Sequence, residues 1–278
     1  MKIVARTAAV VFVLGLTGCI LMWMTGRFDP FITVDEKQVI DGSSVQAIEV
    51  EADSFDVSVI PGDGNDIEMH LYGEYIDRKF KDKFEITASA SGNRLKIKAE
   101  STKKWAFLTM GRTSPEIIVK VPEKLYDEVR VLMTSGNVGI EDLQAGQLAV
   151  QSTSGNTKIS GFSGNRLEFQ GTSGNVSIQE AEGELAVTLT SGNVKISNSA
   201  LSKNAAVKTT SGNINLYAEE FPSSLQLDLR TESGNVSAKV PNLVYQEKEE
   251  NRIVGQVGQG GPLLKLQATS GNVKIAQQ

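Results

Sequence analysis

The tripeptide Ser-Gly-Asn recurs along the chain at nearly constant intervals, and this repeat limits the possible folds more than any other feature. A fixed period of about 19 residues is typical of repeat architectures, in which each unit packs only against its neighbours. The last interval is close to two periods, which indicates an insertion or an excursion between coils. Seven copies in this register are separated by 19, 19, 18, 20, 22 and 37 residues and begin at Ser135, Ser154, Ser173, Ser191, Ser211, Ser233 and Ser270. Two further copies lie outside the register: the copy at Ser91 is interpreted as a turn between two strands, and the copy at Ser163 as a turn on the opposite side of its coil.

Apolar residues alternate with other residues on both sides of each Ser-Gly-Asn. In one copy, Leu185, Val187 and Leu189 precede the tripeptide, and Val194 and Ile196 follow it. A period of two indicates strands with one buried face. The sequence therefore predicts an all-β chain, a β-solenoid of coils of about 19 residues with one corner at each Ser-Gly-Asn.

The polar residues of the repeat are interpreted as parts of these corners. Glycine readily adopts the positive φ of a sharp corner, and asparagine bonds to nearby backbone. Stacked coils lie about 4.8 Å apart, so equivalent asparagines are expected to form an amide ladder. A parallel row of threonines precedes the corners, with Glu232 as the exception. The asparagines of the expected ladder are Asn137, Asn156, Asn175, Asn193, Asn213, Asn235 and Asn272.

The same frame is recognisable near the beginning of the solenoid. Between Ile48 and Val59 the apolar residues keep the register, with Phe55 in the glycine position and Asp56 in the asparagine position. The solenoid is therefore expected to span residues 45–278, with residues 67–121 supplying the coils that lie between this copy and Ser135. Residues 242–262 are expected to form a protruding hairpin before the last coil.

The N-terminal residues 1–26 are predicted to be a membrane anchor, followed by a linker over residues 27–44. Residues 8–24 are almost continuously apolar and follow two basic residues. This pattern favours an uncleaved transmembrane helix with a cytoplasmic N-terminus. The segment ending in Cys19 also resembles the lipobox of bacterial lipoproteins, so lipidation of Cys19 and a cleaved signal peptide stay open. Each alternative places the main domain outside the cytoplasm.

Composition excludes several classes of function. The net charge is −5, and a mildly acidic chain without a basic stripe is a poor nucleic-acid binder. With one cysteine and one histidine, His70, the chain lacks the ligands of a zinc site. His70 lies in an alternating strand segment and is interpreted as a surface residue. No metal, cofactor or catalytic residue is predicted.

A break in the repeat is the best candidate for partner recognition, because function tends to lie on loops held by a rigid scaffold. A basic pair adjoins aromatic and aliphatic residues there, which fits contact with a protein, a glycan or lipid headgroups. The alternative is that the aromatic side chains cover the coil edges. The residues of this possible partner contact are Lys103, Lys104, Trp105, Phe107 and Leu108.

The recurrent Thr-Ser-Gly-Asn-Val-x-Ile unit, as in Thr190–Ile196 and Thr269–Ile275, resembles the bacterial putative-adhesin family of unknown function, which includes LiaG-like proteins. The resemblance covers nearly everything after Val45. It implies a single-stranded right-handed β-helix and an association with envelope stress. The expected function is a membrane-anchored, non-enzymatic binding or adhesin-like scaffold of the cell envelope. The alternatives are a carbohydrate-active β-helix, such as a polysaccharide lyase or hydrolase, and a purely structural component.

Overall fold

The computed structural model describes residues 17, 32–75, 84–101 and 115–278. Its strands form one 21-stranded mixed sheet, which confirms the predicted all-β class. In the part of the chain described here, no helix has the length and apolar character needed to cross a membrane. The predicted anchor, including Cys19, lies outside the described residues apart from Thr17.

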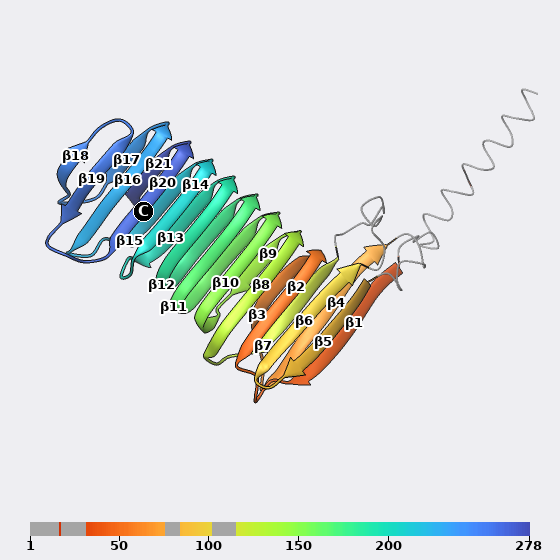
Figure 1. Cartoon of the computed structure of the whole chain (residues 1–278). Helices are drawn as coiled ribbons and strands as arrows, with labels where there is room; N and C mark the ends of the chain where they lie inside the picture. The colour runs from red at the N-terminus through yellow and green to blue at the C-terminus, as the bar shows by residue number, and fades with distance from the viewer. Residues whose placement is uncertain (1–16, 18–31, 76–83, 102–114) are drawn as a thin grey trace, which may run out of the picture.

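The sheet folds into an elongated stack with two faces that meet at the Ser-Gly-Asn corners (Figure 1). The face formed by the strands that lead to the corners is called the pre-corner face. The other is called the post-corner face. The pre-corner face has the spatial order β5 (Phe84–Ser91), β6 (Arg94–Ser101), β2 (Ala47–Ser54), β8 (Tyr126–Ser135), β10 (Gln144–Ser154), the second half of β11 (Thr157–Ser173), the second half of β12 (Val176–Ser191), β14 (Ala205–Ser211), β20 (Leu263–Ser270), β16 (Leu225–Ser233), β19 (Arg252–Val257) and β18 (Val244–Lys248). The post-corner face has the order β1 (Ile32–Asp41), β4 (Asp66–Tyr75), β7 (Glu116–Pro122), β3 (Asp56–Gly62), β9 (Val138–Glu141), the first halves of β11 and β12, β13 (Val194–Ala200), β15 (Ile214–Glu220), β21 (Val273–Gln277) and β17 (Val236–Lys239).

Parallel pairing within the stack keeps equivalent residues of successive coils side by side. Leu148 of β10 pairs with Val129 of β8 and with Leu167 of β11, so three apolar side chains align across three coils. The inward side chains of both faces form one continuous core, in which Val187 and Ile196 are fully buried. Burial of each such side chain stabilises the fold by about 1.5–3 kcal/mol.

The order of coils at the N-terminal end differs from the order in the sequence. β2 and β3 lie directly beside β8 and β9, pairing Ile48 with Val129 and Val57 with Val138. β6 and β7 lie on the outer side of β2 and β3. The expectation that residues 67–121 lie between the two copies is therefore wrong. Their apolar alternation fits the outer side of the first coil equally well, and there they cover the end of the core.

The order of coils also differs from the sequence order at the C-terminal end, where β20 and β21 lie between two coils that precede them in sequence. β20 pairs with β14 on one side and with β16 on the other, and β21 pairs likewise with β15 and β17. This insertion explains the 37-residue interval (Figure 1). The intervening residues do form the predicted hairpin, made of β18 and β19, but the hairpin extends the sheet instead of protruding from it. β19 continues the sheet antiparallel to β16 because Ile253 and Val257 supply a buried face.

Part of the segment predicted as a linker is also a strand. β1 pairs with β4 along its whole length, and Val34 is buried. The alternation is hard to recognise in the sequence because polar Gln38 occupies a position that faces the sheet interior. Its amide nitrogen donates to the carbonyl of Ile86 at 3.1 Å, which satisfies the polar group there.

Candidate functional site

The asparagines of the corners form a continuous ladder along the solenoid axis. The side-chain oxygen of Asn175 accepts two bonds from Asn193, one from its backbone N–H and one from its side-chain amide, both at 3.1 Å. Side-chain amide bonds repeat from Asn137 to Asn213, and backbone N–H bonds continue the ladder to its end. The ladder runs in the spatial order Asp56, Asn137, Asn156, Asn175, Asn193, Asn213, Asn272 and Asn235.

Glycine is required at these corners for two reasons. Gly174 has φ of 112°, and a Cβ atom there would lie 1.9 Å from the carbonyl oxygen of Gly155. The other glycines at the corners of the asparagine ladder also have a positive φ and a similarly close carbonyl oxygen. Phe55 replaces glycine in the first coil, which has no Ser-Gly-Asn coil against its outer side. Its buried ring contacts Phe84 edge-on at 5.5 Å. These corner residues are therefore architectural.

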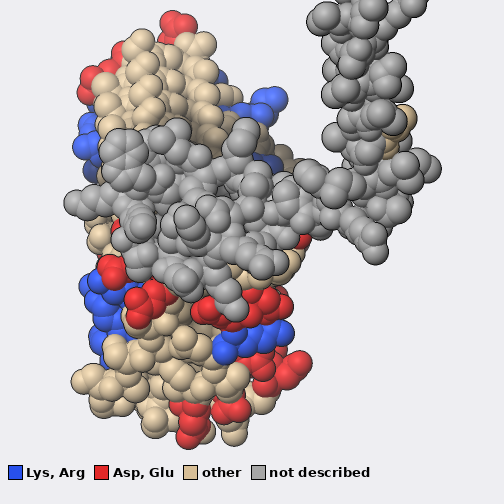
Figure 2. Space-filling view, turned by 90° about the vertical axis from the view of Figure 1, so that its right-hand side faces the viewer, with Lys and Arg blue, Asp and Glu red and all other residues tan. Residues whose placement is uncertain are grey.

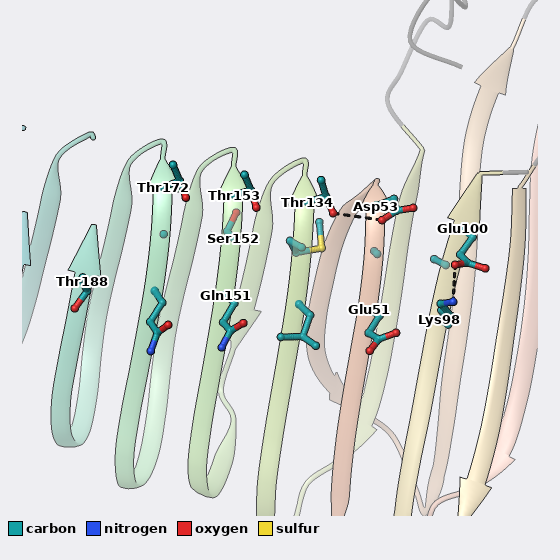
Figure 3. A pocket seen from close by; sticks show the side chains of 16 residues that line it. Glu51, Asp53, Lys98, Glu100, Thr134, Gln151, Ser152, Thr153, Thr172 and Thr188 are labelled. Carbon is teal, nitrogen blue, oxygen red and sulfur yellow. Dashed lines mark hydrogen bonds and ion pairs between the residues drawn. The ribbon is translucent and has the colours of Figure 1, made fainter. Parts of the chain in front are cut away.

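A groove of about 760 Å³ runs beside the corners on the outer surface of the pre-corner face, and we call it the threonine groove. Figure 3 shows Thr134, Thr153 and Thr172 in a row at the ends of successive strands. Since successive coils lie about 4.8 Å apart, the groove offers a hydroxyl at each step. Its lining residues are Glu51, Ala52, Asp53, Lys98, Ala99, Glu100, Leu132, Met133, Thr134, Gln151, Ser152, Thr153, Gln170, Gly171, Thr172 and Thr188.

The groove changes chemical character along its length. Exposed hydroxyls and amides, including those of Gln151 and Gln170, line the part over β10 to β12. At the N-terminal end Thr134 donates to the carboxylate of Asp53 at 3.3 Å. Lys98 forms an ion pair with Glu100 at 2.5 Å beyond it (Figure 3). The groove thus has a neutral polar floor and one charged end.

Ion pairs continue from the charged end across the pre-corner face. Lys96 lies between Glu49 and Glu51, at 2.9 and 2.6 Å, and Arg94 contacts Glu128 at 2.8 Å. The hydrogen bond from Lys96 lowers the pKa of Glu49, and the hydrogen bond from Arg94 lowers the pKa of Glu128. Basic and acidic side chains lie side by side in the view of this end of the molecule (Figure 2).

Each carboxylate of the groove contacts another side chain. Glu51 and Glu100 form ion pairs with lysines, and Asp53 accepts a hydrogen bond from Thr134. Within the described ranges, no group of three or more His, Cys, Asp or Glu residues could hold a metal ion. His70 lies away from the groove and contacts Asp35 at 2.8 Å.

The predicted contact residues Lys103, Lys104, Trp105, Phe107 and Leu108 lie outside the described residues. In the chain they follow β6, whose Lys98 and Glu100 line the threonine groove. The groove itself was not predicted. The sequence signal that could have identified it is the threonine before most of the Ser-Gly-Asn corners, together with a glutamine two residues before that threonine in two coils.

Three comparisons with known proteins place these features in context. A family model described as Toastrack DUF4097 matches residues 45–184 and again residues 172–276. No match to a curated protein was found.

Similar solved structures include a putative cell adhesion protein from Clostridium sporogenes, with 12% identity over 89% of this chain and 100% of that chain and a TM-score of 0.44. Putative adhesins from Bacteroides fragilis (15% identity, 89% and 97% covered, TM-score 0.34) and Parabacteroides distasonis (12% identity, 87% and 96% covered, TM-score 0.42) also match. At these TM-scores the similarity carries no inference about function.

Proposed function

We propose that this chain, which belongs to the Toastrack DUF4097 family, is a membrane-anchored, non-enzymatic binding protein of the bacterial cell envelope. The family match bears out the resemblance to bacterial putative adhesins of unknown function. In this proposal residues 1–26 hold the chain at the membrane. The β-solenoid, wound as a right-handed β-helix, presents its surface outside the cytoplasm.

The observation that supports a binding role is the threonine groove. It lies on strands that are stacked in register, so its hydroxyls and amides are held at fixed spacing by the scaffold. A ligand that repeats along its length would meet an equivalent hydrogen-bonding group at each coil. The neutral polar floor over β10 to β12 fits the hydroxyl groups of a cell-wall glycan. A protein partner that extends a peptide along the same groove is the second candidate.

Binding of cell-wall glycans by the purified full-length chain in non-ionic detergent tests this function. The variant Thr153→Ala/Thr172→Ala removes two groove hydroxyls that are exposed and carry no fold-determining contact. With about 0.5–1.5 kcal/mol for each of the two hydrogen bonds, affinity is expected to fall roughly 5- to 150-fold. The matched control is Thr210→Ala/Thr269→Ala, which changes the same corner position on β14 and β20, beyond the groove, and should alter affinity less than about twofold.

Two results would overturn the proposed function. If both double variants lose affinity equally, the groove is not the binding site. If the purified chain cleaves the glycan, the alternative of a carbohydrate-active β-helix replaces the binding function. If no cell-wall glycan binds, crosslinking from Trp105 in intact cells tests the protein partner, because a contact at residues 103–108 should crosslink a specific protein.

The anchor is tested separately. Metabolic labelling with a fatty-acid probe is expected to leave the chain unlabelled if residues 1–26 form an uncleaved helix. Label that depends on Cys19, and that disappears in Cys19→Ala, would replace the helix with a lipid anchor.

A further inference from the structure

Three lysines form a row on the outer surface of the post-corner face, and we call them the lysine row. They are Lys158 on β11, Lys195 on β13 and Lys274 on β21. Ser177 separates the first two in the strand register, and Asn215 separates the second and third. A lysine therefore occurs in every second coil, at intervals of about 10 Å for strands about 4.8 Å apart.

An aromatic side chain holds two of these lysines in place. Tyr217 lies on β15, between the strands that carry Lys195 and Lys274. The ammonium groups of these lysines lie 5.9 and 5.3 Å from the centre of its ring. Cation–π attraction limits their freedom, so less conformational entropy is lost when they bind a ligand.

The lysine row is not neutralised by the protein. From β11 to β17, the two outward positions that follow each corner contain no carboxylate. Among the described residues, no carboxylate lies within ion-pair distance of Lys158, Lys195 or Lys274, in contrast to the paired charges of the pre-corner face. A positive strip thus persists on a chain whose net charge is −5.

The asparagine ladder adds hydrogen-bond donors beside this row. From Asn137 to Asn193 each ladder oxygen already accepts two bonds from the next asparagine, as Asn156 does from Asn175 at 3.0 and 3.2 Å. An amide nitrogen carries two N–H groups, and the ladder uses one of them. The exposed edge therefore presents donors whereas its acceptors are occupied. The ladder from Asn137 to Asn213 and two of the lysines, Lys158 and Lys195, line a common groove of about 820 Å³ over β3 to β15. Asp56 and Glu116 lie at the β3 end of this groove, and Lys274 continues the row beyond its other end.

We propose that this surface binds a linear polyanion that extends along the solenoid axis. Ammonium groups at regular spacing and a parallel row of amide donors complement a polymer with regularly spaced phosphate or carboxylate groups. The three lysines form a single line, and two of them lie in a groove, which fits one extended chain better than a flat lipid surface. This surface lies on the opposite side of the corners from the threonine groove, so the proposal does not depend on the glycan function.

The test measures binding of the full-length chain, in non-ionic detergent, to lipid-free poly(glycerol phosphate), to polygalacturonate and to neutral dextran. We expect at least one of the two polyanions, but not dextran, to bind, with affinity that falls as salt is raised. The variant Lys158→Gln/Lys195→Gln/Lys274→Gln should bind roughly 30- to 100-fold more weakly, at about three- to fivefold for each exposed charge. The arginine version of the same triple variant should retain binding.

The matched control removes three positive charges from elsewhere. Lys203→Gln/Lys208→Gln/Lys265→Gln changes the net charge equally, at exposed positions outside the row, and should alter affinity less than about twofold. Binding of only one polyanion identifies whether phosphodiester or carboxylate groups are recognised. Equal losses in both triple variants, or no binding of either polyanion, would overturn the proposal.

A lipid surface is distinguished by hydrogen exchange. The full-length chain is reconstituted in neutral or phosphatidylglycerol vesicles without polymer, and exchange is followed at residues 157–160, 194–197 and 273–276. We expect the same exchange in both vesicles, and protection when the bound polyanion is added. Protection by anionic vesicles alone would assign the row to the membrane and refute the polymer.

Discussion

Replacing Gly174 with alanine tests whether close stacking at the corners determines the fold. Two costs are expected together. The left-handed conformation at φ of 112° costs an alanine about 1–2 kcal/mol. In addition, a Cβ atom 1.9 Å from the carbonyl oxygen of Gly155 forces the two coils apart. This separation breaks at least one of two bonds between the coils, from the backbone N–H of Asn175 to Asn156 and from that of Thr157 to Asn175.

A backbone group that loses its partner costs about 1–3 kcal/mol, so the variant should lose about 2–5 kcal/mol in total. Alanine substitutions at two other glycines separate the cost of the backbone conformation from the cost of the close contact. Gly92 has a φ of 61° and open space where a methyl group would be added, so Gly92→Ala should cost about 1 kcal/mol. Gly139→Ala meets Ser58 at an ordinary 3.5 Å, without a positive φ, and should stay within about 0.5 kcal/mol of wild type.

The assay is urea unfolding of the full-length chain in non-ionic detergent, followed by far-ultraviolet circular dichroism. Hydrogen exchange at residues 155–157 and 174–176 locates the damage. We expect Gly174→Ala to be much less stable than Gly92→Ala, with faster exchange at both corners. A free energy of unfolding for Gly174→Ala within about 1 kcal/mol of that for Gly92→Ala would show that the coils separate without loss, and would refute the reasoning.

Three further predictions concern the core, the ladder and the ion pairs. Thr157→Val should raise the free energy of unfolding by about 1 kcal/mol, because the Thr157 hydroxyl is buried without a partner between two valines; thermal or urea unfolding measures this. Asn175→Asp should destabilise the chain by about 1–3 kcal/mol, because it removes the amide donor that bonds to Asn156. Asp56→Asn should be nearly neutral, because Asp56 begins the ladder and only accepts hydrogen bonds. Parallel urea titrations compare the two variants. Because the pKa values of Glu49 and Glu128 are lowered in the folded chain, these two carboxylates stabilise the fold at pH values above their ordinary pKa of 4.5. This stabilisation is lost as the pH falls through the folded-state pKa values. Glu49→Gln/Glu128→Gln should therefore make the urea midpoint depend less on pH in the acid range.

Local features of the fold could be predicted from the sequence because each follows from a local cause. Alternating apolar residues define the strands, and the glycine of Ser-Gly-Asn defines the corner. The asparagine ladder needs only that equivalent corners be stacked. The substitution of Asp56 for asparagine is equally local, because the first member of the ladder needs an acceptor and no donor.

The spatial order of the coils could not be predicted because every coil presents nearly the same edges. Ile48 pairs as well with Leu95 on one side as with Val129 on the other. One sequence signal of the order exists at the C-terminal end, where Glu232 replaces the usual threonine before the corner. The structure shows that this coil is outermost, and Val236 and Ala238 are accordingly less buried than their counterparts in other coils.

The candidate site was only partly predictable. The threonine row is visible in the sequence, but a groove depends on the depth between the row and neighbouring side chains, which periodicity does not reveal. The lysine row could not be predicted either, because its members are scattered in the sequence. They form one line only because β21, which carries Lys274, is inserted next to β15.

The insertion of β20 and β21 also determines when the solenoid can be completed. Among the described strands, the coil formed by β16 and β17 has no parallel neighbour other than β20 and β21. It therefore cannot dock as it emerges, although the coils before it can add one after another. Residues 225–239 must wait until residues 263–277 are available. We therefore expect folding of this end to be one late, concerted event rather than a continuation of stepwise winding.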